Sequence, residues 1–217
     1  MTRILLVIIS TLIWIHGCTQ PRSQEDKSAR LVGGDCEECE AVFEYGSKKL
    51  SWTDTLPDYN DNGPRMEVSG TIYQRDGKTP VAGVILYIYH TDQEGIYPTR
   101  GDESGWAKRH GYIRGWIKTD QTGKYKFYTL RPGAYPGRRN PEHIHATIKE
   151  PGISAYWIDE YLFEDDPILT KEEKAAQKKR AGNGILKLTK DSNGTLIAHR
   201  DIILGLNIPG YDKLINN

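Results

Sequence analysis

The 217-residue sequence has little sulfur and no excess of either charge. It contains three Cys and two Met, and its 29 basic residues are balanced by 29 acidic ones. The lack of net positive charge argues against a nucleic-acid partner, because binding to phosphates depends on clustered Lys and Arg. Only 3 Phe are present, against 13 Tyr and 5 Trp, so most aromatic rings carry a polar group. Such rings are common in strands and pockets, which favours a β-rich protein.

The sequence also lacks an apolar run of the roughly 20 residues that a membrane-spanning helix needs. Its main apolar run, Ile4 to Ile15, follows a short charged start and ends just before Gly17 and Cys18. This arrangement is typical of an export signal, and its end resembles the lipobox of bacterial lipoproteins. We therefore expect residues 1–17 to be a lipoprotein signal peptide and Cys18 to be lipidated. The protein is then exported to the bacterial cell envelope and touches the membrane only through that lipid.

Two cysteines remain once Cys18 is assigned to the lipid, and they lie close together as Cys36 and Cys39. An even pair in an oxidising compartment indicates a local disulfide, which is the interpretation we favour. The alternatives are half of a zinc site and a thioredoxin-type redox motif. Both are weakened because the sequence has no second Cys pair and no βαβ pattern around the first.

The rest of the chain divides into a polar tether, residues 18–30, and one domain, residues 31–217. In the second part, short apolar runs alternate with Gly, Pro, Asn and Asp, a pattern typical of strands and turns. The fold predicted is all-β, an antiparallel β-sandwich with one peripheral helix at Lys171 to Ala181, where Lys, Glu and Ala dominate. Strands are expected at Glu67 to Gln74, Gly83 to His90, Gly115 to Thr119, Tyr125 to Leu130, His143 to Lys149, Tyr156 to Phe163, Ile185 to Leu188 and Thr195 to Leu204.

Two histidines, His143 and His145, share one of these expected strands. Because side chains alternate across a strand, both imidazoles project from one face, where they can bind one metal ion. The same pattern occurs in zinc and cupin-type sites and on ordinary solvated strands. The pair alone therefore does not decide between a metal site and a polar surface.

Two tyrosines each follow the end of an expected strand. Tyr97 comes after the strand that ends at His90, and Tyr135 comes after the one that ends at Leu130. Such positions are where a rigid sheet presents side chains to a pocket. The simpler interpretation of either residue alone is a ring that covers the core and keeps its hydroxyl in water.

The motifs around these four residues resemble those of the intradiol ring-cleavage dioxygenases. The resemblance covers about residues 66 to 166, and the separation of the two tyrosines, 135 − 97 = 38 residues, also resembles that of the family. The motifs, in the family's order, are Gly95-Ile96-Tyr97, Arg114-Gly115-Trp116, Thr119-Asp120 with Gly123, Tyr125, Phe127 and Thr129, Pro132-Gly133 with Tyr135-Pro136, and Pro141 with His143-Ile144-His145. The resemblance implies that Tyr97, Tyr135, His143 and His145 are the ligands of a non-haem Fe(III).

The same resemblance implies an activity. It is intradiol cleavage: a catechol-type dihydroxyaromatic reacts with O₂, and the ring opens between its two hydroxyl-bearing carbons to give a muconate-type dicarboxylic acid. Tyr135 is expected to be catalytic, first as a ligand and then as the base that accepts a substrate proton. Two phenolates favour a ferric ion, because a phenol with a pKa near 10 needs a strongly charged cation to ionise at neutral pH.

The sequence departs from the family pattern in one place. Family members commonly have Arg immediately before the Pro of the His-x-His motif, where this chain has Asn140. Arg138 and Arg139 lie just upstream and are our candidates for substrate binding. The segment from Tyr135 to His143 is also shorter than in the catechol and protocatechuate enzymes.

Two other functions remain open at this point. One is a non-enzymatic β-sandwich lipoprotein that keeps the scaffold for binding, and the other is a zinc or ferrous enzyme that adds Glu142 or Glu150 to the two histidines. His90 and His110 are expected to be surface or hydrogen-bonded residues outside the site. The sequence leaves the oligomeric state open.

Overall fold

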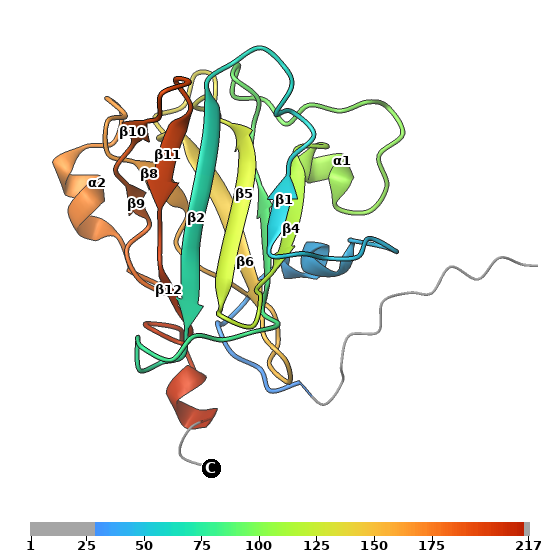
Figure 1. Cartoon of the computed structure of the whole chain (residues 1–217), viewed down its shortest axis with the longest axis vertical. Helices are drawn as coiled ribbons and strands as arrows, with labels where there is room; N and C mark the ends of the chain where they lie inside the picture. The colour runs from blue at the N-terminus through green and yellow to red at the C-terminus, as the bar shows by residue number, and fades with distance from the viewer. Residues whose placement is uncertain (1–28, 215–217) are drawn as a thin grey trace, which may run out of the picture.

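The computed structural model describes the backbone of residues 29–214 and the side chains of residues 29–212. The expected signal peptide, the expected lipidation site Cys18 and nearly all of the tether lie outside this part of the chain. Two six-stranded sheets pack face to face as a sandwich (Figure 1). Within the described residues, no helix combines the length and the apolar character that crossing a bilayer requires.

The first sheet has the strand order β1-β5-β2-β11-β10, and β12 also pairs with β2. Its strands are β1 (Thr53–Thr55), β2 (Arg65–Tyr73), β5 (Lys124–Leu130), β10 (Thr189–Lys190), β11 (Leu196–His199) and β12 (Ile202–Ile203). Along β2, buried and partly exposed residues alternate strictly, as expected for a strand with one face on the core. Gly70 is required in β2, because a Cβ there would overlap the carbonyl oxygen of Arg200.

The second sheet has the order β4-β3-β6-β8-β9, and β7 pairs with β6. Its strands are β3 (Ile85–Tyr89), β4 (Arg114–Lys118), β6 (His143–Lys149), β7 (Tyr156–Trp157), β8 (Tyr161–Phe163) and β9 (Ile185–Leu186). Leu86 and Ile88 of β3 and Ile144 and Ile148 of β6 are fully buried in the core between the sheets. On the opposite face, Tyr87 and Tyr89 of β3 pack against Ala41 and Val42 in a second, smaller apolar cluster.

The fold class predicted from the sequence is confirmed, and the structure corrects several details. Both sheets are mixed, because β1 and β5, β2 and β11, β2 and β12, and β8 and β9 run parallel. The single strand expected at Tyr156 to Phe163 is two strands, and so is the one expected at Thr195 to Leu204. In the second case the break falls at the buried Arg200, whose side chain donates to the carbonyl oxygen of Asp159 in a neighbouring segment.

The helices also differ from the prediction. α2 (Lys171–Ala176) begins where expected, with a capping box between Thr170 and Glu173, but it ends five residues early. None of its residues is buried, so no packing extends it beyond its propensity. Three short helical elements were not predicted: η1 (Cys39–Phe43), α1 (Ala107–His110) and η2 (Tyr211–Leu214). In the structure Cys36 and Cys39 form a disulfide at the start of η1.

Candidate metal centre

The two histidines of β6 lie on the face of the second sheet that points away from the core. His143 and His145 alternate with the buried Ile144 and Ala146, so both imidazoles leave the strand on the same side. Tyr89 of β3 pairs with His145 across the ladder, and their rings stack with centroids 4.4 Å apart. The pairing of β3 and β6 therefore fixes the position of His145, and the pairing of His143 with Leu162 of β8 fixes the other histidine.

The two tyrosines come from loops that touch each other through their backbones. Gly95 has a positive φ of 77°, and a Cβ at this position would overlap the carbonyl oxygen of Ala134. The amide of Gly133 donates to the carbonyl of Asp92 at 2.8 Å. Glycine at both contacts lets the loops approach closely, which brings Tyr97 and Tyr135 together.

The polar ends of the four side chains converge on a small space. The hydroxyls of Tyr97 and Tyr135 are in hydrogen-bond contact, and Nε2 of His145 lies 2.9 Å from the first and 3.3 Å from the second. Nε2 of His143 lies 3.2 Å from the hydroxyl of Tyr135 and 3.2 Å from Nε2 of His145. Atoms that all bind one metal ion at about 2 Å are separated by about 3 Å. The distances between these four side chains therefore suit the binding of one shared metal ion.

The other nitrogen of each imidazole has a partner that sets its tautomer. Nδ1 of His143 lies 2.6 Å from the carbonyl oxygen of Pro141, and Nδ1 of His145 lies 3.0 Å from Oε1 of Glu160. A carbonyl and a carboxylate can only accept, so both Nδ1 atoms carry hydrogen and both Nε2 atoms offer a lone pair. This is the usual second-sphere arrangement of histidine ligands.

Burial favours the neutral form of three of the four groups. It lowers the pKa of His143, with the neighbouring His145 adding to the effect. It raises the pKa of Tyr97 and of Tyr135, so both phenols are protonated at neutral pH. Two protonated phenols and two imidazole nitrogens form a donor set that a strongly charged cation can ionise and bind.

Comparisons with known proteins agree with this arrangement. The dioxygenase family model, Dioxygenase_C, matches residues 45–200, which include all four side chains. The chain belongs to the intradiol dioxygenase family.

Two curated relatives of this dioxygenase-family chain are informative. Catechol 1,2-dioxygenase 1 of Acinetobacter lwoffii is 27% identical over 210 residues, which cover 87% of this chain and 64% of the relative. The protocatechuate 3,4-dioxygenase beta chain of Burkholderia cepacia is 27% identical over 113 residues, which cover 49% of this chain and 48% of the relative. The chain therefore spans about half to two thirds of the length of these relatives.

Solved structures share the fold. The dioxygenase domain of a dioxygenase and carbohydrate-binding fusion from Streptomyces sp. SirexAA-E has a TM-score of 0.53 at 23% identity, covering 72% of this chain and 90% of that one. Catechol 1,2-dioxygenase from Acinetobacter sp. ADP1 has a TM-score of 0.53 at 18% identity, covering 73% and 60%. At these identities the likeness shows the sandwich alone.

Glu160 is the residue of this dioxygenase-family site that sequence reasoning missed. It lies between β7 and β8, and with His143 and His145 it forms a group whose possible ligand atoms are all within 4.8 Å of one another. Burial alone raises the pKa of Glu160, but the hydrogen bond and charge of His145, with the charge of His143, hold it below its usual value. In the sequence Glu160 lies inside the strand expected at Tyr156 to Phe163, and nothing there distinguishes it from other carboxylates in strands.

The carboxylates considered from the sequence are engaged elsewhere. Glu142 accepts from Nε of Arg131 at 2.6 Å, and Glu150 accepts from the hydroxyls of Tyr156 at 2.5 Å and Tyr211 at 2.8 Å. Neither therefore joins the histidines. The pair of Arg131 with Glu142 joins both ends of the loop that carries Tyr135, and Arg131 also pairs with Asp165 at 2.9 Å.

The two candidate arginines lie in different settings. The guanidinium of Arg138 lies 5.8 Å from the centre of the Tyr135 ring, and its charge partly opposes the rise that burial causes in the pKa of Tyr135. Arg139 is exposed, and none of the described contacts links it to the four side chains. Arg138 is therefore the candidate that the structure brings close to the site.

The aromatic stacking on His145 extends through Tyr89 to a third ring, that of His110. Tyr89 lies between His145 and His110, with ring centroids 3.7 Å apart on the second side. Its hydroxyl donates to Oε2 of Glu38 at 2.6 Å, and Glu38 lies between the two bonded cysteines in sequence. His110 and His90 are both buried and hydrogen-bonded, and neither reaches the four converging atoms.

Proposed function

We propose that the protein is a non-haem Fe(III) dioxygenase that cleaves a catechol-type ring between its two hydroxyl-bearing carbons. The observation that carries the proposal is the convergence of two phenols and two imidazole lone pairs within hydrogen-bond distance of one another. Family membership and the names of the relatives support the same reaction. In this proposal Tyr97, Tyr135, His143 and His145 hold the iron.

The donor set fits a trivalent ion better than a divalent one. Two phenols whose pKa values are raised by burial ionise only next to a strongly charged cation, whereas zinc and ferrous sites more often combine histidine with carboxylate or thiolate. When bound, ferric iron supplies a centre that takes both catechol oxygens and draws electron density from the ring, which makes a ring carbon reactive toward O₂.

The reaction is balanced by catechol and O₂ alone. The bond between the two hydroxyl-bearing carbons breaks, both oxygen atoms of O₂ enter the product, and a muconate-type dicarboxylic acid forms. The chain must accept protons from the substrate hydroxyls on binding. Tyr135 suits this role, because its hydroxyl is close to both histidines and its loop is partly exposed.

Arg138 and Glu160 act around this centre. Arg138 places a positive charge near Tyr135, and in this proposal that charge stabilises negative charge that develops on the substrate. Glu160 orients His145 through Nδ1 and is a positioning residue in this proposal. The location at the cell envelope and the lipid at Cys18 rest on residues 1–18 alone and remain part of the proposal.

The test combines metal analysis, a visible spectrum and oxygen uptake. A ferric ion bound by phenolate absorbs visible light, so the iron-loaded protein should be coloured, its band should change on adding catechol, and oxygen should be consumed. Tyr97→Phe should lose or shift the band, while Tyr59→Phe, a tyrosine that packs on Tyr128 away from the site, should not. Colourless iron-loaded protein, or no oxygen uptake with a panel of catechols, contradicts the proposal and favours a binding protein.

One observation favours a second candidate function. His143, His145 and Glu160 could form a two-histidine, one-carboxylate site for a divalent ion. It ranks second because Glu160 faces Nδ1 of His145, whereas the phenols face Nε2. The divalent site would be favoured if the purified protein contained zinc or ferrous iron and if Tyr135→Phe left its activity unchanged.

A further inference from the structure

The imidazole of His145 is held at an edge and at a face. At the edge, its Nδ1 lies 3.0 Å from Oε1 of Glu160. At the face, it stacks on the ring of Tyr89, with centroids 4.4 Å apart and an angle of 13° between the planes. A hydrogen bond at one nitrogen leaves a ring free to tilt about that bond, whereas a flat ring against its face removes this freedom. The direction of the Nε2 lone pair therefore depends on Tyr89 as well as on Glu160.

Tyr89 is itself enclosed on the side away from His145. Its residue is only 6% exposed, and its ring stacks on His110 with centroids 3.7 Å apart and an angle of 7° between the planes. Its hydroxyl donates to Oε2 of Glu38 at 2.6 Å. Rotation of the Tyr89 ring would break this hydrogen bond and both stacks. Glu38 and His110 therefore constrain His145 through Tyr89.

Glu38 belongs to a short segment, residues 36–44, that precedes the residues matched by the family model, 45–200. The disulfide between Cys36 and Cys39 closes a loop around Glu38. A covalent bond across so short a loop restricts the backbone that carries the carboxylate. The contact between Glu38 and Tyr89 therefore lies outside what family membership implies.

The other half of this segment is fixed to the second sheet. The carbonyl oxygen of Ala41 accepts from Nε1 of Trp116 at 3.1 Å, and Glu44 accepts from Arg114 at 2.7 Å. Both partners belong to β4, which pairs with β3. Ala41 also packs with Tyr89 in the smaller apolar cluster. The segment is therefore a firm support for Tyr89 at both of its ends.

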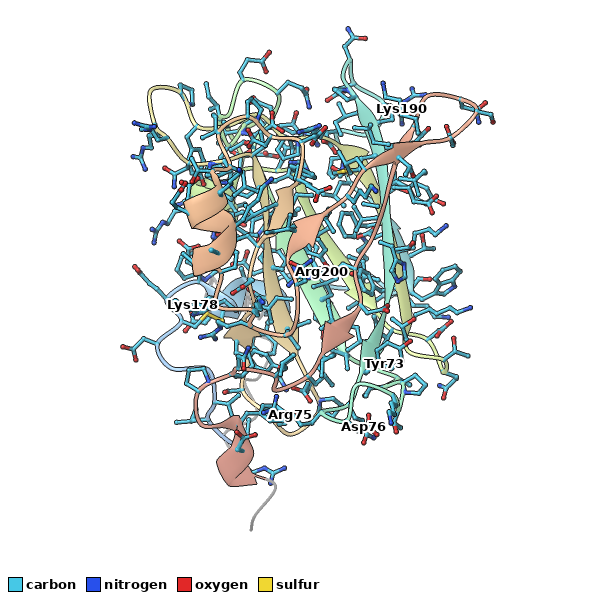
Figure 2. All side chains as sticks on the ribbon, turned by 90° about the vertical axis from the view of Figure 1, so that its left-hand side faces the viewer. Tyr73, Arg75, Asp76, Lys178, Lys190 and Arg200 are labelled. Atoms are coloured by element: carbon cyan, nitrogen blue, oxygen red, sulfur yellow. A yellow bond between two sulfur atoms is a disulfide. The ribbon has the colours of Figure 1, made fainter. Side chains whose placement is uncertain are left out.

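The disulfide lies at the edge of this support rather than in the main core. Cys36 is partly exposed and lines, with His145 and Lys178, a cavity of about 530 Å³. Lys178 is labelled in Figure 2, which views the side of the molecule that carries α2. Neither Cys36 nor Cys39 belongs to the core between the two sheets. Both can therefore be replaced by alanine without opening that core.

We propose that Tyr89 is a positioning residue of the metal centre, which holds the imidazole of His145 in its binding orientation and is itself held by Glu38 of the disulfide-closed segment. The inference rests on the proposed function for the identity of the metal ion. The orientation of His145 can be measured without any metal. The proposal gives residues 36–44 a role in metal affinity.

The first experiment measures the imidazole nitrogens of His145 by NMR in the metal-free full-length protein. The signals of Nδ1 and Nε2 are far apart while one tautomer is fixed, and they approach each other when both tautomers are populated. Tyr89→Leu should bring them together, because a freed ring loses its fixed contact with Glu160. Tyr89→Phe keeps the stacked ring and should leave them nearly unchanged.

The matched control for this experiment is Phe127→Leu. It removes a fully buried ring from the core between the sheets, so it should lower the free energy of unfolding without moving the His145 signals. Signals that stay apart in Tyr89→Leu, or that move as far in Phe127→Leu, overturn the inference and leave the proposed function standing.

The second experiment measures the affinity for Fe(III) by competition with a chelator. Tyr89→Leu should weaken binding by about tenfold, and Tyr89→Phe, which loses only the hydroxyl that meets Glu38, by about threefold. The variant Cys36→Ala/Cys39→Ala should also lose about threefold. Combining it with Tyr89→Phe should cost no more than either change alone, because both break the same link. Phe127→Leu should bind iron as the wild type does.

The outcomes separate the two claims. If the wild type binds no iron, or binds it without a visible band, while Tyr89→Leu still frees His145, the proposed function is wrong and the positioning role stands. If Tyr89→Leu binds iron as tightly as the wild type, the positioning role is wrong and the proposed function stands. Losses that add in the combined variant contradict the route from the disulfide through Glu38 to Tyr89.

Discussion

The two faces of the second sheet carry histidines in opposite situations. On the face toward the core, His90 follows β3 and is completely buried, with Nδ1 2.7 Å from the carbonyl of Thr91 and Nε2 2.6 Å from the hydroxyl of Thr129. Thr129 in turn contacts Asp58 at 3.0 Å. Burial lowers the pKa of His90 and raises that of Asp58, so the pair tends toward neutrality, and each nitrogen of His90 has one hydrogen-bond partner.

On the outer face, imidazole nitrogens and hydroxyl oxygens lie so close together that hydrogen-bond acceptors outnumber the available hydrogens. Nε2 of His145 has two phenol oxygens and another imidazole nitrogen within 3.3 Å, although a lone pair accepts only one hydrogen. Two phenols offer two hydrogens to a group of four acceptors, so the cluster is richer in lone pairs than in donors. A histidine with one partner at each nitrogen is structural, whereas lone pairs crowded around one point indicate a cation.

The largest effect is expected from Tyr135→Phe. The variant removes a ligand and the proposed base together, so turnover of a catechol should fall by about 10²- to 10⁴-fold. Steady-state oxygen uptake measures the change. Unchanged turnover would mean that the outer cluster is no more functional than the inner one.

Glu160→Ala should have a smaller effect. Nδ1 of His145 loses its acceptor, and loss of such a second-sphere partner typically weakens metal affinity by about 10- to 100-fold. Competition with a chelator measures the affinity. Glu160→Gln keeps an acceptor oxygen and should recover most of it, whereas equal losses in both variants would indicate that Glu160 is itself a ligand.

The matched substitution on the inner face is His90→Ala. It removes the partner of the Thr91 carbonyl and one of the partners of the Thr129 hydroxyl, which keeps Asp58, so the free energy of unfolding should fall by about 1–3 kcal/mol. Urea unfolding measures this loss. The visible spectrum per bound iron should stay unchanged, and a shifted band would show that the two faces are not independent.

The smallest effect concerns the dependence of stability on pH. Burial raises the pKa of Glu150, although the hydroxyls of Tyr156 and Tyr211 and the charge of Lys149 oppose the rise. The folded state then binds the proton more tightly than the unfolded state, so stability is greatest below the unfolded pKa near 4.5 and declines as pH rises through the folded pKa. Unfolding in urea at several pH values should show this decline in the wild type and less of it in Glu150→Gln. Parallel pH profiles would contradict the assignment.

The sequence predicted the site better than its surroundings. The alternation along His143 to His145 and the positions of the two tyrosines after strands are local features, and local geometry determines them. Glu160 was missed because its role depends on β7 and β8 returning to β6, a contact between residues far apart in sequence. The parallel pairing of β11 with β2 was missed for the same reason, since alternation predicts a strand but not the direction of its neighbour.

The disulfide illustrates a further limit. The spacing of Cys36 and Cys39 favoured a local bond, but nothing in the sequence indicated that Glu38 between them reaches Tyr89 behind a histidine of the site. The cavity lined by His145 and Glu160 likewise combines residues from the disulfide segment, β6, β7 and the end of α2. Such a surface exists only after the strands have paired.

The most direct test is a crystal structure of the iron-loaded protein with diffraction data measured at the iron absorption edge. The account predicts one anomalous peak at about 2.0–2.2 Å from the hydroxyl oxygens of Tyr97 and Tyr135 and from Nε2 of His143 and His145. Iron bound elsewhere, or bound by Glu160 with both tyrosines beyond bonding distance, would contradict it.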